Sequence, residues 1–229
     1  MIVLYTVERE YPYGTLRSTN ASKVKVVLEE KGLPYRVERL RPGDLWKKPP
    51  ELLAKHPLGK VPFIEDDSLL VYDSTVINEY LEERYPEPRL LPREQAGLPA
   101  GAAERARARM LENFGDEAIL VGDLPLIWIP WWSRPEERDA ARMETAREGL
   151  RKRAFPYLEK ELHGRDYLCG ADFTLADAPF AALAMVLEVD GLALDEFPRL
   201  ASYLERLRSR PSYRAISPRT SLAESAGRP

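Results

Sequence analysis

Hydrophobic positions in the first 85 residues follow the spacing of strands in four short segments. Residues 2–5 form an apolar run, and Tyr35 and Val37 alternate with charged neighbours, so both segments predict strands. Residues 63–64 and 69–72 are two further apolar runs, separated by the polar residues 66–68. This last pair predicts a hairpin.

A helix is predicted between the first two strands, from about Ser22 to Gly32, because one face is apolar and another is polar. The apolar face contains Ala21, Val24, Val27 and Leu28, and the polar face contains Lys23, Lys25, Glu29 and Glu30. Apolar residues at helical spacing also follow the hairpin. The order of strand, helix, strand, helix, hairpin and helix matches a thioredoxin-like sheet.

The second half of the chain has helical spacing throughout. The first predicted helix begins at Ala102, and the second spans residues 136–162, with Ser133 and Glu136 as its capping box. A third helix begins at the capping pattern of Thr174 and Asp177 and runs to about Val189. The last helix is marked by an apolar stripe of Phe197, Leu200, Tyr203, Leu204 and Leu207. Thr174 and Asp177 are expected to be structural. No strand pattern interrupts these helices.

We therefore predict an α/β domain followed by an all-helical domain. The first covers residues 1–85, the second covers residues 99–216, and a proline-rich linker joins them at 86–98. The polar end, residues 217–229, lacks apolar anchors and is expected to be mobile unless it folds over the body of the protein.

Composition narrows the classes of partner. A chain of 229 residues with 44% hydrophobic content and a net charge of −3 is ordinary for a folded protein and argues against nucleic acid or acidic membranes as partners. No apolar run is long enough to span a bilayer, and the N-terminus lacks the pattern of a secretion signal, so we expect a cytoplasmic protein. Cys169, His56 and His163 form no cluster with zinc spacing, so no metal is expected.

The most informative segment is HPLGKVPFIEDDSLLVYDS, residues 56–74. Pro62 has no N–H and tolerates a cis peptide bond, so the backbone of Val61 can offer a free edge to a peptide-like ligand. Asp73 and Ser74 precede a predicted helix, whose first N–H groups favour a carboxylate. These features together suit an acidic peptide.

This segment resembles the glutathione-binding half of the cytosolic glutathione transferases, of a serine-type or related bacterial class. The resemblance implies that glutathione is the co-substrate and that the backbone of Val61, before Pro62, pairs with its cysteinyl residue. It also implies that Asp73 and Ser74 hold the γ-glutamyl end, and that Lys60 attracts the glycyl carboxylate. Members usually form two-fold homodimers, so we expect one here.

A thiol donor is expected near the start of the first helix. The run from Ser18 to Val24, STNASKV, resembles the family pattern Ser-x-x-Ser-(Arg/Lys)-x-Val, although its serines are four residues apart and its lysine directly precedes the valine. The resemblance implies that the Ser18 hydroxyl donates to the glutathione sulfur, and the match of Asn20 to an Asn of some bacterial relatives implies that Asn20 assists. Ser22 is expected only to cap the helix. The loop before Ser18 is longer than the family's usual loop, which leaves Tyr5, Tyr11 and Tyr13 as alternative donors.

Three of the four tryptophans lie between residues 124 and 132. Trp128, Trp131 and Trp132, with Tyr13 from the long loop, are predicted to line a pocket for a hydrophobic second substrate. The alternative is that the tryptophans are core or dimer-contact residues.

Motifs of other enzymes are absent from the sequence. It contains no GxSxG, no GxGxxG after a strand and no CxxC pair. We therefore predict a glutathione transferase whose activated thiolate attacks a hydrophobic electrophile or a disulfide. The alternative is a non-catalytic interaction module with the same fold.

Overall fold

A computed structural model describes residues 1–11, 14–41, 43–92, 101–132 and 134–218. The first part is built on a four-stranded sheet of order β4-β1-β5-β6. Its strands are β1 (Ile2–Thr6), β4 (Tyr35–Arg39), β5 (Phe63–Asp66) and β6 (Leu69–Tyr72). β1 is parallel to β4 and antiparallel to β5, and β5 and β6 form the predicted hairpin. All four predicted strands are confirmed.

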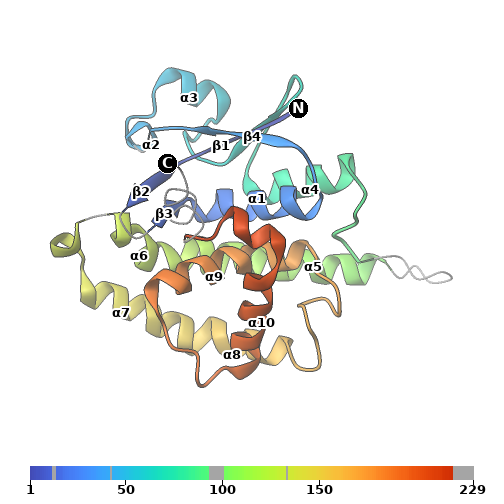
Figure 1. The fold of residues 1–229 in the computed structure, drawn as a ribbon, viewed down its shortest axis with the longest axis vertical. Helices are drawn as coiled ribbons and strands as arrows, with labels where there is room; N and C mark the ends of the chain where they lie inside the picture. Colours follow the sequence, from blue (N-terminus) through green and yellow to red (C-terminus); the bar gives the residue numbers. More distant parts are fainter. Residues whose placement is uncertain (12–13, 42, 93–100, 133, 219–229) are drawn as a thin grey trace, which may run out of the picture.

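Helices cover both faces of this sheet, as Figure 1 shows. α1 (Thr19–Glu30) and α4 (Ser74–Arg84) lie on the side of the helical part of the chain. The short helices α2 (Asp44–Lys47) and α3 (Pro50–Lys55) lie on the other side. α1 and α4 bury the apolar residues Val24, Val27, Leu28, Ile77 and Leu81, as their helical spacing predicts.

The long loop between β1 and α1 contains a second, two-stranded sheet. β2 (Glu8–Tyr11) pairs antiparallel with β3 (Gly14–Arg17). The sequence predicts only a loop here, so these two strands are a correction. The hairpin has no apolar alternation of its own and is instead held by charged groups on the rest of the molecule, described below.

The second part is helical. Its segments are α5 (Ala102–Phe114), a π-helical stretch η1 (Gly115–Asp123), α6 (Leu124–Trp128), the short turns η2 (Ile129–Trp132) and η3 (Pro135–Glu137), α7 (Ala140–Gly149), a π-helical stretch η4 (Leu150–Ala154), α8 (Phe155–Glu161), η5 (Leu175–Asp177), α9 (Ala178–Asp190), α10 (Pro198–Ser209) and η6 (Pro211–Ala215). α9 is apolar on all sides because it lies at the centre of this part, and it also packs against α1 (Figure 1).

Two predictions about helix starts meet different outcomes. The capping box of Thr174 and Asp177 is confirmed, since the Thr174 N–H donates to the Asp177 carboxylate at 2.8 Å. The helix predicted from Glu136 begins instead at Ala140, with Asp139 as its N-cap. Ser133, its predicted partner in the capping box, lies outside the described residues.

One prediction about α1 is wrong. Ser18, not Ser22, is the N-cap, and Ser22 is buried inside the helix with its hydroxyl 3.6 Å from the sulfur of Met185. On the polar face of α1, Lys23 is fully buried, whereas Glu29 is exposed. Within the described part of the chain, no helix combines the length and apolar character needed to cross a membrane.

Candidate functional site

Three segments that the sequence analysis singled out meet at one edge of the sheet. Tyr5 near the end of β1 lies opposite Phe63 at the start of β5, and Phe63 lies opposite Tyr72 at the end of β6. The loop to α1, the peptide before β5 and the start of α4 therefore leave the sheet at the same end. This register brings the segments of Ser18, Val61 and Asp73 to one side of the molecule.

The Val61-Pro62 peptide is cis, and Pro62 is buried while Lys60 is exposed. His56 lies beside this turn, with its ring 4.9 Å from that of Tyr72. Burial lowers the pKa of His56, the charge of Lys60 lowers it further, and the charge of Asp73 opposes both. Lys60 and Asp73 therefore both act on one imidazole, which supports their being close together.

Asp73 is the N-cap of α4. One of its carboxylate oxygens accepts the backbone N–H groups of Thr75 at 3.0 Å and Val76 at 3.2 Å. Its φ of 73° and ψ of 125° lie in a region that L-residues rarely occupy, at a cost of about 1–3 kcal/mol. Strain of this kind gathers at ligand sites. Ser74 follows in the first turn and is buried.

Ser18 caps α1 and is half-buried. Its Oγ accepts the N–H of Ala21 at 3.3 Å, which leaves the hydroxyl hydrogen available to donate elsewhere. Asn20 lies two residues further on, and its side-chain oxygen is buried with no hydrogen-bond partner among the described residues. At this helix N-terminus Ser18 can therefore still donate a hydrogen bond, whereas the unpartnered Asn20 atom can only accept one.

The tyrosine alternatives are placed unequally. The hydroxyl of Tyr5 donates to Glu65 at 2.8 Å and accepts from Lys55 at 3.0 Å, and its ring stacks on Phe63. The phenol is thus engaged with β5 and α3. The side chains of Tyr11 and Tyr13 lie outside the described residues.

The tryptophans of the predicted pocket also differ in their surroundings. Trp128 is buried, and its indole N–H donates to the backbone carbonyl of Arg17 at 2.8 Å. These contacts favour the packing alternative for Trp128. Trp131 is half-buried, with the guanidinium of Arg138 4.3 Å from its ring. The side chain of Trp132 lies outside the described residues.

Lys23 is a residue near the site whose role the sequence analysis missed. Its ammonium group donates to Thr75 at 2.9 Å, Glu112 at 2.7 Å and Asp116 at 2.6 Å. Because Thr75 belongs to the first turn of α4, Lys23 ties the Asp73-Ser74 segment to α1 and α5. Its place directly after Ser22, where the family pattern has Arg or Lys after its second serine, was the available signal.

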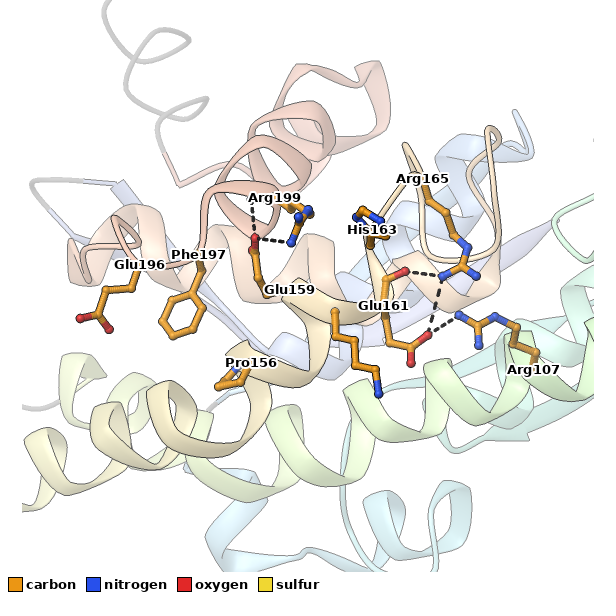
Figure 2. A pocket seen from close by; sticks show the side chains of 10 residues that line it. Arg107, Pro156, Glu159, Glu161, His163, Arg165, Glu196, Phe197 and Arg199 are labelled. Atoms are coloured by element: carbon orange, nitrogen blue, oxygen red, sulfur yellow. Dashed lines mark hydrogen bonds and ion pairs between the residues drawn. The ribbon is translucent and has the colours of Figure 1, made fainter.

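A surface pocket of about 710 Å³ lies elsewhere, between α8 and the start of α10. Figure 2 shows Glu161 paired with Arg107 and Arg165, and Glu159 paired with Arg199. Glu159 also accepts the N–H of Leu200 at 2.9 Å, which occupies the N-terminus of α10. Most of the charged side chains of this pocket are paired with one another, and we assign it no ligand. Among the described residues, no group of acidic, His or Cys side chains is arranged to hold a metal ion.

The fold and the site together define a class. A thioredoxin-like domain that gathers a capped hydroxyl, a proline-led hairpin and an acid-serine pair at one sheet edge, fused to a helical domain, is the architecture of glutathione-transferase-like proteins. Comparison with known families agrees. The family model "Glutathione S-transferase, N-terminal domain" matches residues 13–89, and "Glutathione S-transferase, C-terminal domain" matches residues 124–211.

Individual relatives support the same assignment. FtsZ-localized protein A of Caulobacter vibrioides is 30% identical over 206 residues, covering 85% of this chain and 84% of its own. Glutathione S-transferase GstB of Escherichia coli is 30% identical over 212 residues, covering 89% and 95%. A theta class glutathione S-transferase from Xanthomonas axonopodis pv. citri, solved with glutathione bound, has a TM-score of 0.76 at 24% identity, covering 94% and 96%. The chain belongs to the glutathione S-transferase family.

Proposed function

We propose that this protein is a glutathione transferase in which Ser18 stabilises the glutathione thiolate for attack on a hydrophobic electrophile or a disulfide. The observation that carries the proposal is the state of the Ser18 hydroxyl. Its oxygen accepts from the helix, so its hydrogen is free to donate towards a sulfur placed beside the N-terminus of α1.

The pKa shift that Ser18 must produce in the glutathione thiol is small. A free thiol has a pKa of about 8.5, and each unit of depression requires roughly 1.4 kcal/mol of extra stabilisation of the thiolate. One hydroxyl donor and the positive end of α1 supply an effect of that size. Asn20 is proposed as an assisting donor, and proximity of thiolate and electrophile supplies the rest.

The ligand contacts follow the sheet edge. We propose that the Val61 backbone pairs with the cysteinyl unit, that Asp73 and Ser74 hold the γ-glutamyl end, and that Lys60 attracts the glycyl carboxylate. The strain at Asp73 and the shared influence of Lys60 and Asp73 on His56 support this arrangement. A protein that uses a reduced thiol as substrate belongs in a reducing compartment, and we propose the cytoplasm.

The second substrate is proposed to lie against Trp131, together with Trp132 and Tyr13. Trp128 is reassigned from this pocket to an interdomain contact because it is buried and its N–H is engaged.

Ser18→Ala tests the function. With glutathione and 1-chloro-2,4-dinitrobenzene as substrates, we expect kcat/KM to fall and the pKa of the bound thiol, followed by ultraviolet absorbance, to rise towards that of free glutathione. Binding of glutathione by calorimetry should stay nearly unchanged. The matched control is Ser22→Ala on the same helix, which removes a hydroxyl that faces Met185.

The alternatives predict other results. Loss of the cap lowers stability by about 1 kcal/mol, so both variants are compared well below their melting temperatures. If the protein is a non-catalytic interaction module, it should bind glutathione weakly or not at all, and neither the unchanged protein nor Ser18→Ala should show turnover. Full activity in Ser18→Ala would overturn the role of Ser18.

A homodimer is proposed from exposed apolar residues on adjoining elements. Leu69 and Tyr72 on the edge strand β6, Val76 on α4 and Met110 on α5 are 45% to 69% exposed. A second copy would bury them, as large exposed apolar patches usually require. Analytical ultracentrifugation should give twice the chain mass, and Val76→Arg should shift the protein to monomer.

A further inference from the structure

The peptide group that joins Arg17 to Ser18 is held at both of its polar ends. Its carbonyl, on Arg17, accepts the indole N–H of Trp128 at 2.8 Å. Its N–H, on Ser18, donates to the carbonyl of Val7 at 3.2 Å. Because the carbonyl and the N–H share one rigid plane, these two bonds fix how that plane is turned.

The two anchors come from distant parts of the chain. Val7 precedes the β2-β3 hairpin, whereas Trp128 ends α6 in the helical part and is 4% exposed. Burial keeps water from replacing the indole donor. A carbonyl left unpaired in that position would carry the cost of an unsatisfied buried group.

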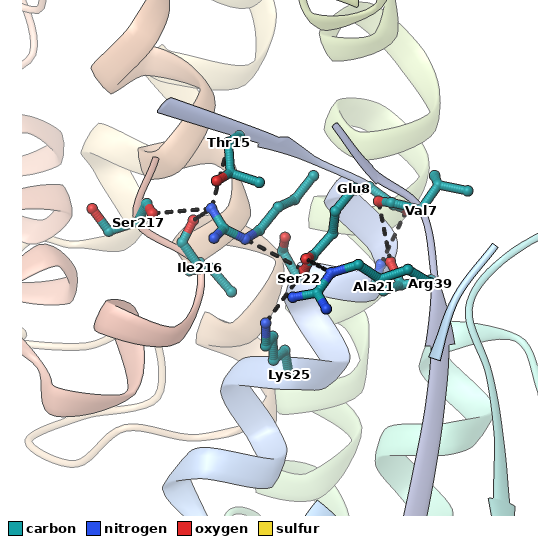
Figure 3. Close-up of polar contacts among 12 residues, drawn as sticks. Val7, Glu8, Thr15, Ala21, Ser22, Lys25, Arg39, Ile216 and Ser217 are labelled. Atoms are coloured by element: carbon teal, nitrogen blue, oxygen red, sulfur yellow. Dashed lines mark hydrogen bonds and ion pairs between the residues drawn. The ribbon is translucent and has the colours of Figure 1, made fainter. Parts of the chain in front are cut away.

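The side chain of Arg17 adds a third anchor. Its guanidinium donates to the carbonyls of Thr15, Ile216 and Ser217 at 3.0 to 3.3 Å. Figure 3 shows Ile216 and Ser217 on one side of this cluster and Glu8 with Lys25 and Arg39 on the other. Residue 17 is therefore held by its side chain as well as by its carbonyl.

We propose that Trp128 is a positioning residue, whose indole N–H holds the Arg17 carbonyl and thereby sets the direction of the Ser18 hydroxyl. The inference rests on the proposed function, since it assigns Trp128 an effect on the thiol through Ser18. The Ser18 carbonyl is held in α1 by the N–H of Ser22 at 2.9 Å. With that side of Ser18 fixed, the orientation of the preceding peptide plane sets the φ of Ser18, which is −60°, and with it the direction of the Cα–Cβ bond. Without the indole donor the Arg17-Ser18 peptide plane can turn, so the Ser18 hydroxyl no longer points at the sulfur of bound glutathione, while α1 itself persists.

Trp128→Phe removes the N–H and keeps most of the ring. The control is Trp46→Phe, whose indole is 82% exposed on α2 and makes no contact with the Arg17 carbonyl. In Trp128→Phe we expect the thiol pKa of bound glutathione to rise by about 0.5 to 1 unit, which corresponds to the free energy of one neutral hydrogen bond. The glutathione Kd should stay nearly unchanged. In Ser18→Ala, adding Trp128→Phe should raise that pKa no further, because both act on one hydroxyl.

Hydrogen exchange tests the positioning independently of catalysis. Peptides that contain Ser18 to Ser22 should exchange severalfold faster in Trp128→Phe than in the unchanged protein and in Trp46→Phe. Equal exchange in all three proteins would overturn the inference. Equal thiol pKa values in Trp128→Phe and the unchanged protein, where Ser18→Ala does raise the pKa, would overturn it as well.

The two proposals fail in different ways. If Ser18→Ala leaves the thiol pKa unchanged, the proposed donor is wrong and the catalytic effect of Trp128 falls with it, whatever the exchange data show. If Trp128→Phe does not fold, the unchanged protein supplies the measurement. The NMR signal of the Trp128 indole N–H should then exchange far more slowly than that of the exposed Trp46, and it should shift in Ser18→Ala. The absence of a shift would count against the coupling.

Discussion

Lys23 carries an ammonium group that is fully removed from water, and it holds groups from three helical segments. Thr75 belongs to α4, Glu112 to α5 and Asp116 to η1. Burial raises the pKa of Glu112, while the neighbouring charge and hydrogen bonds of Lys23 lower it. The cluster is stable only as a set, because each carboxylate depends on the one ammonium.

Lys23→Met should therefore destabilise the protein strongly. Removing one partner of a buried ion pair typically costs about 3–5 kcal/mol in the free energy of unfolding. Urea unfolding at neutral pH measures this loss. As the control, Lys152→Met removes an exposed partner of Glu148 and should cost less than about 1 kcal/mol.

The pH dependence of this variant follows from Glu112. A carboxyl whose pKa is higher in the folded than in the unfolded protein binds more protons when folded, so it stabilises the fold at low pH and this contribution is lost as pH rises. Without Lys23 the pKa of Glu112 rises further. The loss in Lys23→Met should be smaller at pH 5 than at pH 8, and a loss independent of pH would contradict the assignment.

At the scale of elements, the β2-β3 hairpin is held by charge rather than by an apolar face. Glu8 on β2 lies among Arg17, Lys25 and Arg39, from β3, α1 and β4 (Figure 3). Burial alone would raise the pKa of Glu8, but the three cations together bring it below its ordinary value. The backbone of Thr15 also donates to the Pro218 carbonyl at 3.2 Å.

Glu8→Gln should loosen this hairpin and lower the free energy of unfolding by roughly 3 kcal/mol, because three cations lose their shared partner. A group with a depressed folded pKa stabilises above the unfolded pKa, and the contribution disappears as pH falls through the folded value. The difference in stability between the unchanged protein and Glu8→Gln should therefore be largest at pH 7 and decrease below about pH 4. Thermal unfolding across pH measures it, with exposed Glu38→Gln as the control; equal losses in both variants would contradict it.

The β2-β3 hairpin could not be predicted from the sequence, whereas several other elements could. The strands of the main sheet, the apolar face of α1 and the capping box at Thr174 were predictable because their signals are local. The hairpin was not, since Glu8 gains its partners from elements far along the chain. Lys23 was misplaced for the same reason: a lysine on a helix normally faces water, and only the carboxylates of α5 and η1 make its burial possible. The motifs singled out the segments of Ser18, Val61 and Asp73, which the sheet register brings to one edge, and their roles towards glutathione are proposals. The anchor of Trp128 on Arg17 has no sequence signature.

At the scale of the molecule, the two parts share one hydrophobic core that runs from β1 to α9. Polar bridges cross between them as well. Arg210, after α10, donates two hydrogen bonds of 2.6 Å to Glu30 at the end of α1 and a third to Tyr167. Such a shared core favours unfolding of both parts together.

Urea unfolding should therefore be a single transition. Far-ultraviolet circular dichroism reports all helices, and fluorescence mainly reports the buried Trp128 and half-buried Trp131, so the two curves should coincide. Arg210→Met should lower the stability of the whole protein by about 2 kcal/mol, the scale of hydrogen bonds to a charged group, and keep the curves coincident. Two separate transitions would show that the parts fold independently.

The anchoring of residue 17 limits which pieces of this protein are exchangeable. Its carbonyl is held by residue 128, its side chain by residues 216 and 217, and the N–H that follows by residue 7. A chimera that takes the N-terminal domain from this chain and the helices from a relative would inherit Ser18 and Val7 without the groups of the helical part that hold residue 17. Recombination between relatives is therefore expected to succeed only when the tryptophan at 128 and the segment at 216–218 travel with the N-terminal domain.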